Sequence, residues 1–260
     1  MKKSIKTFLK TAAKDYSSRS VNPPVVRAST ILFKTMQDLR KHQDDIKKGK
    51  DVQHWDYGRQ GTQTTVQLQK LLKNLEEAYH VFLTPTGFSA VALSIMSICR
   101  PGDEIVISDG VYRPTQKLTD QLLKEFKIKA IWYNPNKFED LKNKITKRTK
   151  LIYVENPGSN TLEMNDLGKI VSLAKSRKIF TAIDNTWATA YFFKPLRLGF
   201  DISITSATKY YSGHSDVMGG TVAVNKKVYN KVWWYNHVSG YRLSPDDAYL
   251  IIRGLRTLDI

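Results

Sequence analysis

The sequence has little cysteine and no long apolar run, and each shortage excludes a class of protein. Cys99 is the only cysteine, so no disulfide can form within the chain, and a reducing compartment such as the cytoplasm is expected. No apolar stretch approaches the length of a membrane span, and lysines interrupt the N-terminal region where the apolar part of a secretory signal would lie. We therefore expect a cytoplasmic protein with no membrane partner.

Acidic residues are also scarce relative to basic ones. The chain has 41 Lys and Arg against 24 Asp and Glu, which gives a formal net charge of +17. Such an excess can indicate nucleic acid, anionic substrates or a negative membrane surface as partners. The basic residues are spread along polar stretches rather than gathered in one tract, which favours a solvated lysine-rich surface and no nucleic-acid partner. A basic, non-catalytic fragment that binds nucleic acid is kept as the non-enzyme alternative.

From Thr62 onward, apolar runs of strand length alternate with helical patterns. Strands are predicted at 81–83, 104–108, 129–133, 151–155, 179–184, 202–204 and 220–224. Near-continuous apolar strands that alternate with helices indicate an α/β fold, with a mostly parallel sheet covered by helices on both faces. Residues 1–60 carry little periodic pattern. We expect them to form an N-terminal arm that contacts a neighbouring subunit, and residues 61–260 to form one large domain.

The most unusual residue of the chain is Lys209, in the polar stretch 206–216 that follows a predicted buried strand. A lysine at the end of a buried strand can lose hydration, lower its pKa and act as an amine nucleophile. The alternative interpretation is a lysine whose side chain snorkels from the strand end into solvent. The residues that follow the other strands decide between the two.

Polar residues follow five of the predicted strands. They are Thr84, Thr86 and Gly87; Asp109 and Tyr112; Asn156 and Ser159; Asp184; and Ser206, Thr208 and Lys209. In an open α/β sheet, ligands bind outside the carboxyl ends of the strands. We therefore expect these residues to gather in one site.

Each of these features has a structural and a functional interpretation. The helix start at Gly87 can be an ordinary cap or a cradle for phosphate. Asp184 either pairs with a basic side chain or meets a cationic ligand, because a lone buried carboxylate is costly. Tyr112 is either an interface residue or a ring that stacks on a planar ligand. Together with Lys209, this set fits pyridoxal phosphate, and it predicts no metal site.

The sequence resembles the pyridoxal-phosphate enzymes of cysteine and methionine metabolism, the transsulfuration family. The resemblance runs from about Tyr57 to the last residue. Its motifs are Tyr-Gly-Arg-Gln-Gly-Thr from Tyr57, Pro-Thr-Gly-Phe around Gly87, Val-Tyr-Arg-Pro-Thr around Tyr112, Glu-Asn-Pro-Gly-Ser from Glu155, Ala-Ile-Asp-Asn-Thr-Trp around Asp184, and residues 206–216. The resemblance implies the large domain of the aspartate-aminotransferase-like fold, known as fold type I.

The resemblance also implies a role for each matching residue. Lys209 would carry the cofactor pyridoxal 5'-phosphate and move protons, Asp184 would pair with the pyridine nitrogen, and Tyr112 would stack on the ring. The phosphate would be bound by Gly87, Phe88, Ser206 and Thr208. Tyr57 and Arg59 would reach into the site of a neighbouring subunit, in a homotetramer built as a dimer of dimers. Phe88 stands where smaller or unbranched residues are common in the family.

The segments Asn-Thr-Trp after Asp184 and Pro-Gly-Ser after Asn156 are similar to the β-lyases of this family. The expected reaction is therefore β-elimination from a thioether amino acid, L-cystathionine, to homocysteine, pyruvate and ammonia in methionine biosynthesis. A γ-synthase, a γ-lyase and an alanine racemase side activity are the enzyme alternatives. Family members continue past the point matched by Ile260 with a further domain, which supplies the arginine that binds the substrate carboxylate. An inactive truncated fragment is thus a further alternative.

Overall fold

The computed structural model describes residues 4–11, 20–48 and 55–260. Its strands are β1 (His80–Thr84), β2 (Glu104–Ser108), β3 (Lys129–Tyr133), β4 (Thr149–Glu155), β5 (Phe180–Asp184), β6 (Ile202–Ser206) and β7 (Gly220–Val224). They form one seven-stranded sheet in the order β1-β7-β6-β5-β4-β2-β3. All seven predicted strands are confirmed, with ends that move by at most two residues. The basic start of the chain, Met1 to Lys3, lies outside the described residues.

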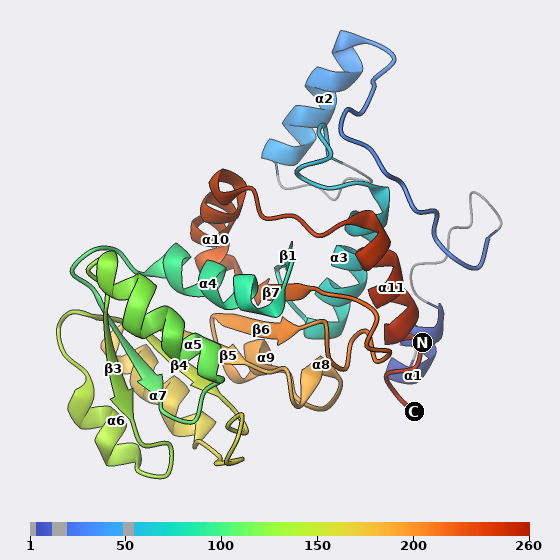
Figure 1. Ribbon diagram of the computed structural model, residues 1–260. Helices are drawn as coiled ribbons and strands as arrows, with labels where there is room; N and C mark the ends of the chain where they lie inside the picture. The colour runs from blue at the N-terminus through green and yellow to red at the C-terminus, as the bar shows by residue number, and fades with distance from the viewer. Residues whose placement is uncertain (1–3, 12–19, 49–54) are drawn as a thin grey trace.

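From β1 to β6, helices lie between successive strands, as the alternating pattern predicts, while other helices precede β1 and follow β7. They are α1 (Ile5–Thr11), α2 (Met36–Lys47), α3 (Gln63–Glu76), α4 (Gly87–Ile98), α5 (Arg113–Lys117), α6 (Phe138–Lys144), α7 (Leu167–Arg177), α8 (Thr189–Phe192), α9 (Pro195–Leu198), α10 (Lys226–Ser239) and α11 (Pro245–Leu255). Helix α5 continues as a π-helix over Leu118–Leu123. Helices cover both faces of the sheet (Figure 1).

The strand directions place six carboxyl ends at one edge of the sheet. Strands β3, β2, β4, β5 and β6 are parallel neighbours, while β7 is antiparallel to both β6 and β1. Strand β1 therefore runs in the same direction as β6. Thr84 and Ser206 both pair with Gly220, so the ends of β1 and β6 lie on either side of that glycine. The polar residues that follow these strands consequently share one edge, as the sequence predicts.

Alternate residues of the buried strands face opposite layers of the core. Ile105 and Ile107 belong to the apolar cluster that α4 and α10 cover, whereas Val106 belongs to the cluster beneath α6 and α7. A third cluster lies between the β1 and β7 end of the sheet and the pair α3 and α11. This period of two is what strands buried on both faces require.

The first sixty residues differ in part from the unpatterned arm that was expected. Helix α1 was not predicted, and its Leu9 is fully buried in the cluster formed with α3 and α11. In contrast, α2 buries none of its residues and projects away from the sheet (Figure 1). Contact of this arm with a neighbouring subunit stays a prediction.

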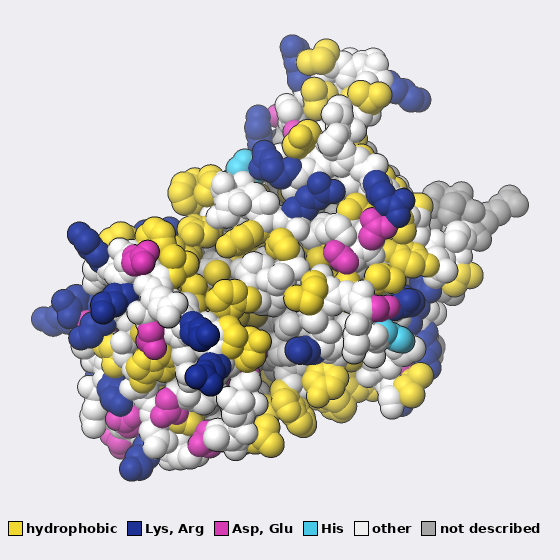
Figure 2. Space-filling view, in the orientation of Figure 1, with side chains coloured by type: hydrophobic (Ala, Val, Ile, Leu, Met, Phe, Trp, Pro, Cys, Tyr) yellow, Lys and Arg dark blue, Asp and Glu magenta, His cyan; other side chains and the backbone are white. Residues whose placement is uncertain are grey.

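The surface agrees with the interpretation of the positive charge. Figure 2 shows Lys and Arg side chains scattered over the visible face, with acidic, polar and apolar side chains between them. In the part of the chain that the structure describes, no helix has the length and apolar character needed to cross a membrane.

A buried carboxyl group connects α3 to the turn that carries Lys209. Glu76, at the end of α3, is 1% exposed and accepts hydrogen bonds from the Tyr211 hydroxyl (2.7 Å) and the Ser203 hydroxyl (3.3 Å). The Tyr211 oxygen in turn accepts the N–H of Ala190 at 3.3 Å. Burial raises the pKa of Glu76 to about 7, although both hydroxyl donors oppose the rise. The turn is therefore attached to the core through a group that titrates near neutral pH.

The raised pKa of Glu76 predicts a loss of stability as the pH rises. Between about pH 4.5 and 7 the carboxyl group is ionised in the unfolded chain but protonated in the fold, so the free energy of unfolding falls over this range. The expected loss is about 3 kcal/mol. Glu76→Gln keeps the hydrogen-bond acceptor and should flatten this part of the pH profile, measured by urea unfolding. Equal pH slopes for Glu76→Gln and the parent chain would contradict the prediction.

The neighbouring Glu77 provides the control. Its carboxylate is 47% exposed and pairs with Lys194 at 2.7 Å. Glu77→Gln should change the free energy of unfolding by less than about 1 kcal/mol throughout the titration, because exposed ion pairs contribute little.

Candidate active site

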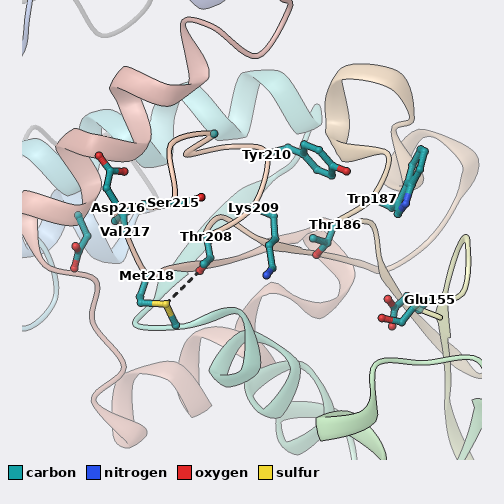
Figure 3. Close-up of a pocket in the computed structure, with 13 residues that line it drawn as sticks. Glu155, Thr186, Trp187, Thr208, Lys209, Tyr210, Ser215, Asp216, Val217 and Met218 are labelled. Carbon is teal, nitrogen blue, oxygen red and sulfur yellow. Dashed lines mark hydrogen bonds between the residues drawn. The ribbon is translucent and has the colours of Figure 1, made fainter.

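A cleft of about 1100 Å³ opens at the carboxyl edge of the sheet and contains the Lys209 side chain (Figure 3). Three strands deliver side chains to it: Glu155 ends β4, Thr186 follows β5, and Thr208 follows β6. The segment between Gly213 and Met218 forms another part of its wall. The cleft is thus built where an open α/β sheet places its ligand.

The turn after β6 fixes the Lys209 backbone. Its N–H donates to the Ser206 carbonyl at 3.1 Å, and its own carbonyl accepts the Gly213 N–H at 2.8 Å. The neighbouring Thr208 hydroxyl is held by Gly219, since it donates to that residue's carbonyl at 3.2 Å and accepts its N–H at 3.1 Å. The lysine side chain points from this turn into the cleft (Figure 3).

One expectation about Lys209 needs correction. The residue is exposed rather than desolvated, because the cleft of the single chain is open to solvent. The features that favour an amine nucleophile are therefore its fixed backbone and its position in the cleft, not the loss of hydration.

The start of α4 has the geometry of an anion site. Thr86 caps the helix by accepting the Ser89 N–H at 3.0 Å. In the described part of the chain, the N–H groups of Gly87 and Phe88 donate to no protein acceptor. A Cβ on Gly87 would lie 2.4 Å from the Ser206 hydroxyl oxygen, so only glycine allows this close approach. Unpaired N–H groups at a helix start beside a hydroxyl suit a phosphate.

Two carboxyl groups, the half-buried Glu155 and the buried Asp184, lie side by side at the ends of β4 and β5. Glu155 and Asp184 are partners in the parallel register, so their side chains leave the same face of the sheet. Asp184 is 8% exposed and accepts the Thr186 N–H at 3.0 Å. Burial raises the pKa of Asp184, and it raises the pKa of Glu155 to about 8, with the charge of Asp184 adding to the rise. A cationic ligand would relieve this cost.

These residues fit the cofactor that the sequence predicts. The start of α4 and the Ser206 hydroxyl offer donors to a phosphate, and Asp184, which forms no ion pair within the described residues, offers a negative charge to a protonated ring nitrogen. Lys209, which lines the cleft, would supply the amine for covalent attachment. The donor set is therefore that of a pyridoxal-phosphate site.

Of the other predicted site residues, Tyr112 lies beside the cleft, whereas Tyr57 and Arg59 lie away from it. Tyr112 is 50% exposed and donates its backbone N–H to the Glu155 carboxyl group at 2.6 Å, so it lies beside the cleft without lining it. Tyr57 and Arg59 do not line the cleft. The Arg59 guanidinium lies 5.9 Å from the centre of the Tyr57 ring and donates to the His237 carbonyl at 3.3 Å. Their expected role in a neighbouring subunit's site stays a prediction.

Sequence reasoning missed several residues that line the cleft, namely Glu155, Thr186, Trp187, Tyr210, Asp216, Val217, Met218 and Asp247. For Glu155 a signal existed, because a carboxylate at the end of an apolar strand is as costly as Asp184. The Nδ1 atom of His214 lies 2.6 Å from the Ser212 carbonyl oxygen. Among the described residues, no cluster of three or more His, Cys, Asp and Glu could hold a metal ion.

Comparison with known proteins gives one consistent family. The model of the Cys/Met metabolism PLP-dependent enzymes matches residues 6–260. Over 249 residues the chain is 36% identical to a cystathionine beta-lyase of Haemophilus influenzae and 32% identical to an L-alanine/L-glutamate racemase of Wolbachia pipientis. These alignments cover 95% and 94% of this chain but 62% and 61% of the relatives, so the chain spans about three fifths of their length.

A solved structure extends the comparison to the fold. A cystathionine gamma synthase of Xanthomonas oryzae pv. oryzae, in complex with aminoacrylate and cysteine, superimposes with a TM-score of 0.89 at 30% sequence identity. The match covers all of this chain and 64% of the other. The fold expected from the sequence is thereby confirmed.

The close approach at the start of α4 predicts that Gly87→Ala destabilises the protein. The added methyl group would also lie 2.6 Å from the Ser206 Cβ, so the strand end must shift, at a cost of about 1–3 kcal/mol. Chemical denaturation measures this loss.

Gly168, which is also in the first turn of a helix, is the matched control. A Cβ there would meet nothing closer than 3.7 Å, so Gly168→Ala should be neutral or stabilise by up to about 1 kcal/mol. Adding Ser206→Gly to Gly87→Ala should recover part of the loss. Equal stabilities of the two alanine variants would show that the approach at Gly87 is not tight.

Proposed function

Because the chain belongs to the Cys/Met metabolism PLP-dependent enzymes, we propose that it binds pyridoxal 5'-phosphate and acts as a carbon–sulfur β-lyase. The proposed substrate is L-cystathionine, which is cleaved to homocysteine, pyruvate and ammonia in methionine biosynthesis. The observation that carries the proposal is that Lys209 in the cleft, the buried Asp184 at the end of β5 and the start of α4 lie at one edge of the sheet. The relative from Haemophilus influenzae supports the choice of reaction.

Each end of the cofactor has its own protein partners. The N–H groups of Gly87 and Phe88, together with the hydroxyls of Ser206 and Thr208, bind the phosphate. Asp184 holds a proton on the pyridine nitrogen, and Tyr112 covers the ring. Lys209 attaches the cofactor covalently through its amine.

When bound, pyridoxal 5'-phosphate supplies an electron sink that stabilises negative charge on the Cα of an amino acid. The Lys209 amine would remove the Cα proton as a general base. The electron pair left at Cα forms the Cα–Cβ double bond while the Cβ–S bond breaks. The sulfur leaves with a proton as homocysteine, and water converts the three-carbon remainder to pyruvate and ammonia.

A second activity, amino-acid racemisation, is favoured by one specific observation. The Wolbachia pipientis relative, named as an L-alanine/L-glutamate racemase, matches over 94% of this chain. The same removal of the Cα proton serves both reactions, and return of a proton to the opposite face of Cα would invert the centre. The γ-elimination and γ-replacement reactions are further alternatives, since the superimposed structure is a gamma synthase.

The proposal includes a cytoplasmic homo-oligomer. The arm that carries Tyr57 and Arg59 would complete the site of a neighbouring subunit, and this accounts for side chains that the single chain keeps away from Lys209. The exposed α2 is consistent with contact to another copy.

The first test is covalent attachment at Lys209. The protein incubated with pyridoxal 5'-phosphate and reduced with borohydride should carry the label on the peptide that contains Lys209, as detected by mass spectrometry. Lys209→Ala should lose the label, and proton-transfer activity should fall by roughly 10²–10⁴-fold. Lys175→Ala, which removes an exposed lysine of α7, should keep both. A Lys209→Ala protein labelled to the same extent would refute the assignment.

The second test identifies the reaction. Pyruvate and homocysteine should appear in equal amounts from L-cystathionine, with racemisation of L-alanine measured beside them. A protein that is labelled on Lys209 but releases no pyruvate is not a β-lyase, and racemisation alone would favour the second activity. Salt-sensitive binding of DNA without cofactor binding would favour the basic non-enzyme alternative.

A further inference from the structure

Glu155 occupies a position in the site that no motif role accounts for. It ends β4 directly opposite Asp184, is half-buried, and lines the cleft that holds Lys209 (Figure 3). Its carboxylate accepts the Tyr112 N–H at 2.6 Å, across 43 residues of sequence. A short hydrogen bond between this carboxyl group and a backbone N–H distant in sequence restrains where that backbone lies.

The restraint acts on the loop between β2 and α5. The Tyr112 ring is half exposed, so packing alone does not fix this residue. The loop that follows β4 makes a second contact with this region. The Ser159 N–H donates to the carbonyl of Gly110, two residues before Tyr112, at 2.8 Å. Two hydrogen bonds from the end of β4 therefore determine where Tyr112 lies relative to the ends of β4 and β5.

We propose that Glu155 is a positioning residue: its carboxyl group fixes the Tyr112 backbone beside the ring site and leaves the negative charge of the carboxyl pair on Asp184. This inference rests on the proposed function, because it gives Glu155 a task toward the cofactor. It adds to that function a residue that does not itself need to touch the cofactor.

The surroundings of Glu155 favour this division of charge. Asp184 faces it from β5, the buried Tyr153 precedes it on β4, the Ser159 hydroxyl faces it from the following loop, and Lys209 lines the same cleft. The Thr186 N–H stabilises the ionised form of Asp184, as the Tyr112 N–H does for Glu155, and the charge of Asp184 adds to the rise in the pKa of Glu155. The burial of Glu155 and the charge of Asp184 together raise the pKa of Glu155 to about 8. Below that pH, Glu155 retains its proton.

Two variants distinguish the effect of the hydrogen-bond acceptor oxygen of Glu155 from the effect of its charge. Glu155→Gln keeps an oxygen that can accept the Tyr112 N–H and mimics the protonated acid, so the dissociation constant for pyridoxal 5'-phosphate should stay within about threefold of the parent value. Glu155→Ala removes the acceptor and should raise that constant roughly tenfold, as expected for one lost buried hydrogen bond. Quenching of tryptophan fluorescence measures the constant.

Glu163 is the matched control, because its carboxylate bonds to Thr161 in the same loop and not to Tyr112. Glu163→Gln should leave cofactor affinity unchanged. A second readout needs no cofactor: carbon-13 NMR of labelled glutamate should show a carboxyl group that titrates near pH 8, absent from Glu155→Gln. This signal keeps the proposal testable if Glu155→Ala fails to fold.

The outcomes are distinct. An unchanged dissociation constant in Glu155→Ala, or no glutamate that titrates near pH 8 in the parent protein, overturns the inference. If the parent protein gains no borohydride-stable label on Lys209, the proposed function fails and the inference fails with it. A parent protein labelled on Lys209, together with a folded Glu155→Ala variant of equal affinity, overturns the positioning role alone.

Discussion

The site depends on two positions where a side chain would not fit. A Cβ on Gly220 would lie 2.3 Å from the Thr86 carbonyl oxygen, and a Cβ on Gly87 would lie 2.4 Å from the Ser206 hydroxyl. Because Gly220 pairs with the last residues of both β1 and β6, the missing side chains let the chain leaving β1 cross close to the sheet and start α4 against β6. The free N–H groups of that helix start therefore lie beside the turn that carries Lys209.

Buried carboxyl groups show which parts of this edge serve structure and which serve a ligand. Glu76 is fully buried, but two hydroxyl groups donate to it, and it connects α3 to the Lys209 turn. Glu155 and Asp184 are placed opposite each other instead, so each raises the cost of ionising its neighbour. Such a pair weakens the fold, and proteins keep perturbed groups of this kind mainly at functional sites. The pair is thus better explained by a cationic ligand than by packing.

The sequence alone predicts the sheet and most of the candidate site, because both follow from patterns of neighbouring residues. Apolar runs locate the strands, and the residues that follow parallel strands must share an edge, so Asp184, Ser206 and Lys209 could be grouped before their contacts were known. The bond from Glu155 to Tyr112 could not be foreseen, because it depends on strand register and loop path together. The burial of Leu9 likewise comes from a tertiary contact of a seven-residue helix with no strong pattern of its own.

The exposure of Lys209 cannot be predicted from the local sequence alone. A strand end predicts where a lysine lies, but its hydration depends on what covers the cleft, and in the single chain the cleft is open. Exclusion of water strengthens every electrostatic contact in an active site, including those of Asp184 and the start of α4. In the proposed enzyme, a cover must therefore come from outside the described site. Tyr57 and Arg59 are suited to that task, because their exposed aromatic and cationic groups lie on the surface and leave the chain's own cleft free.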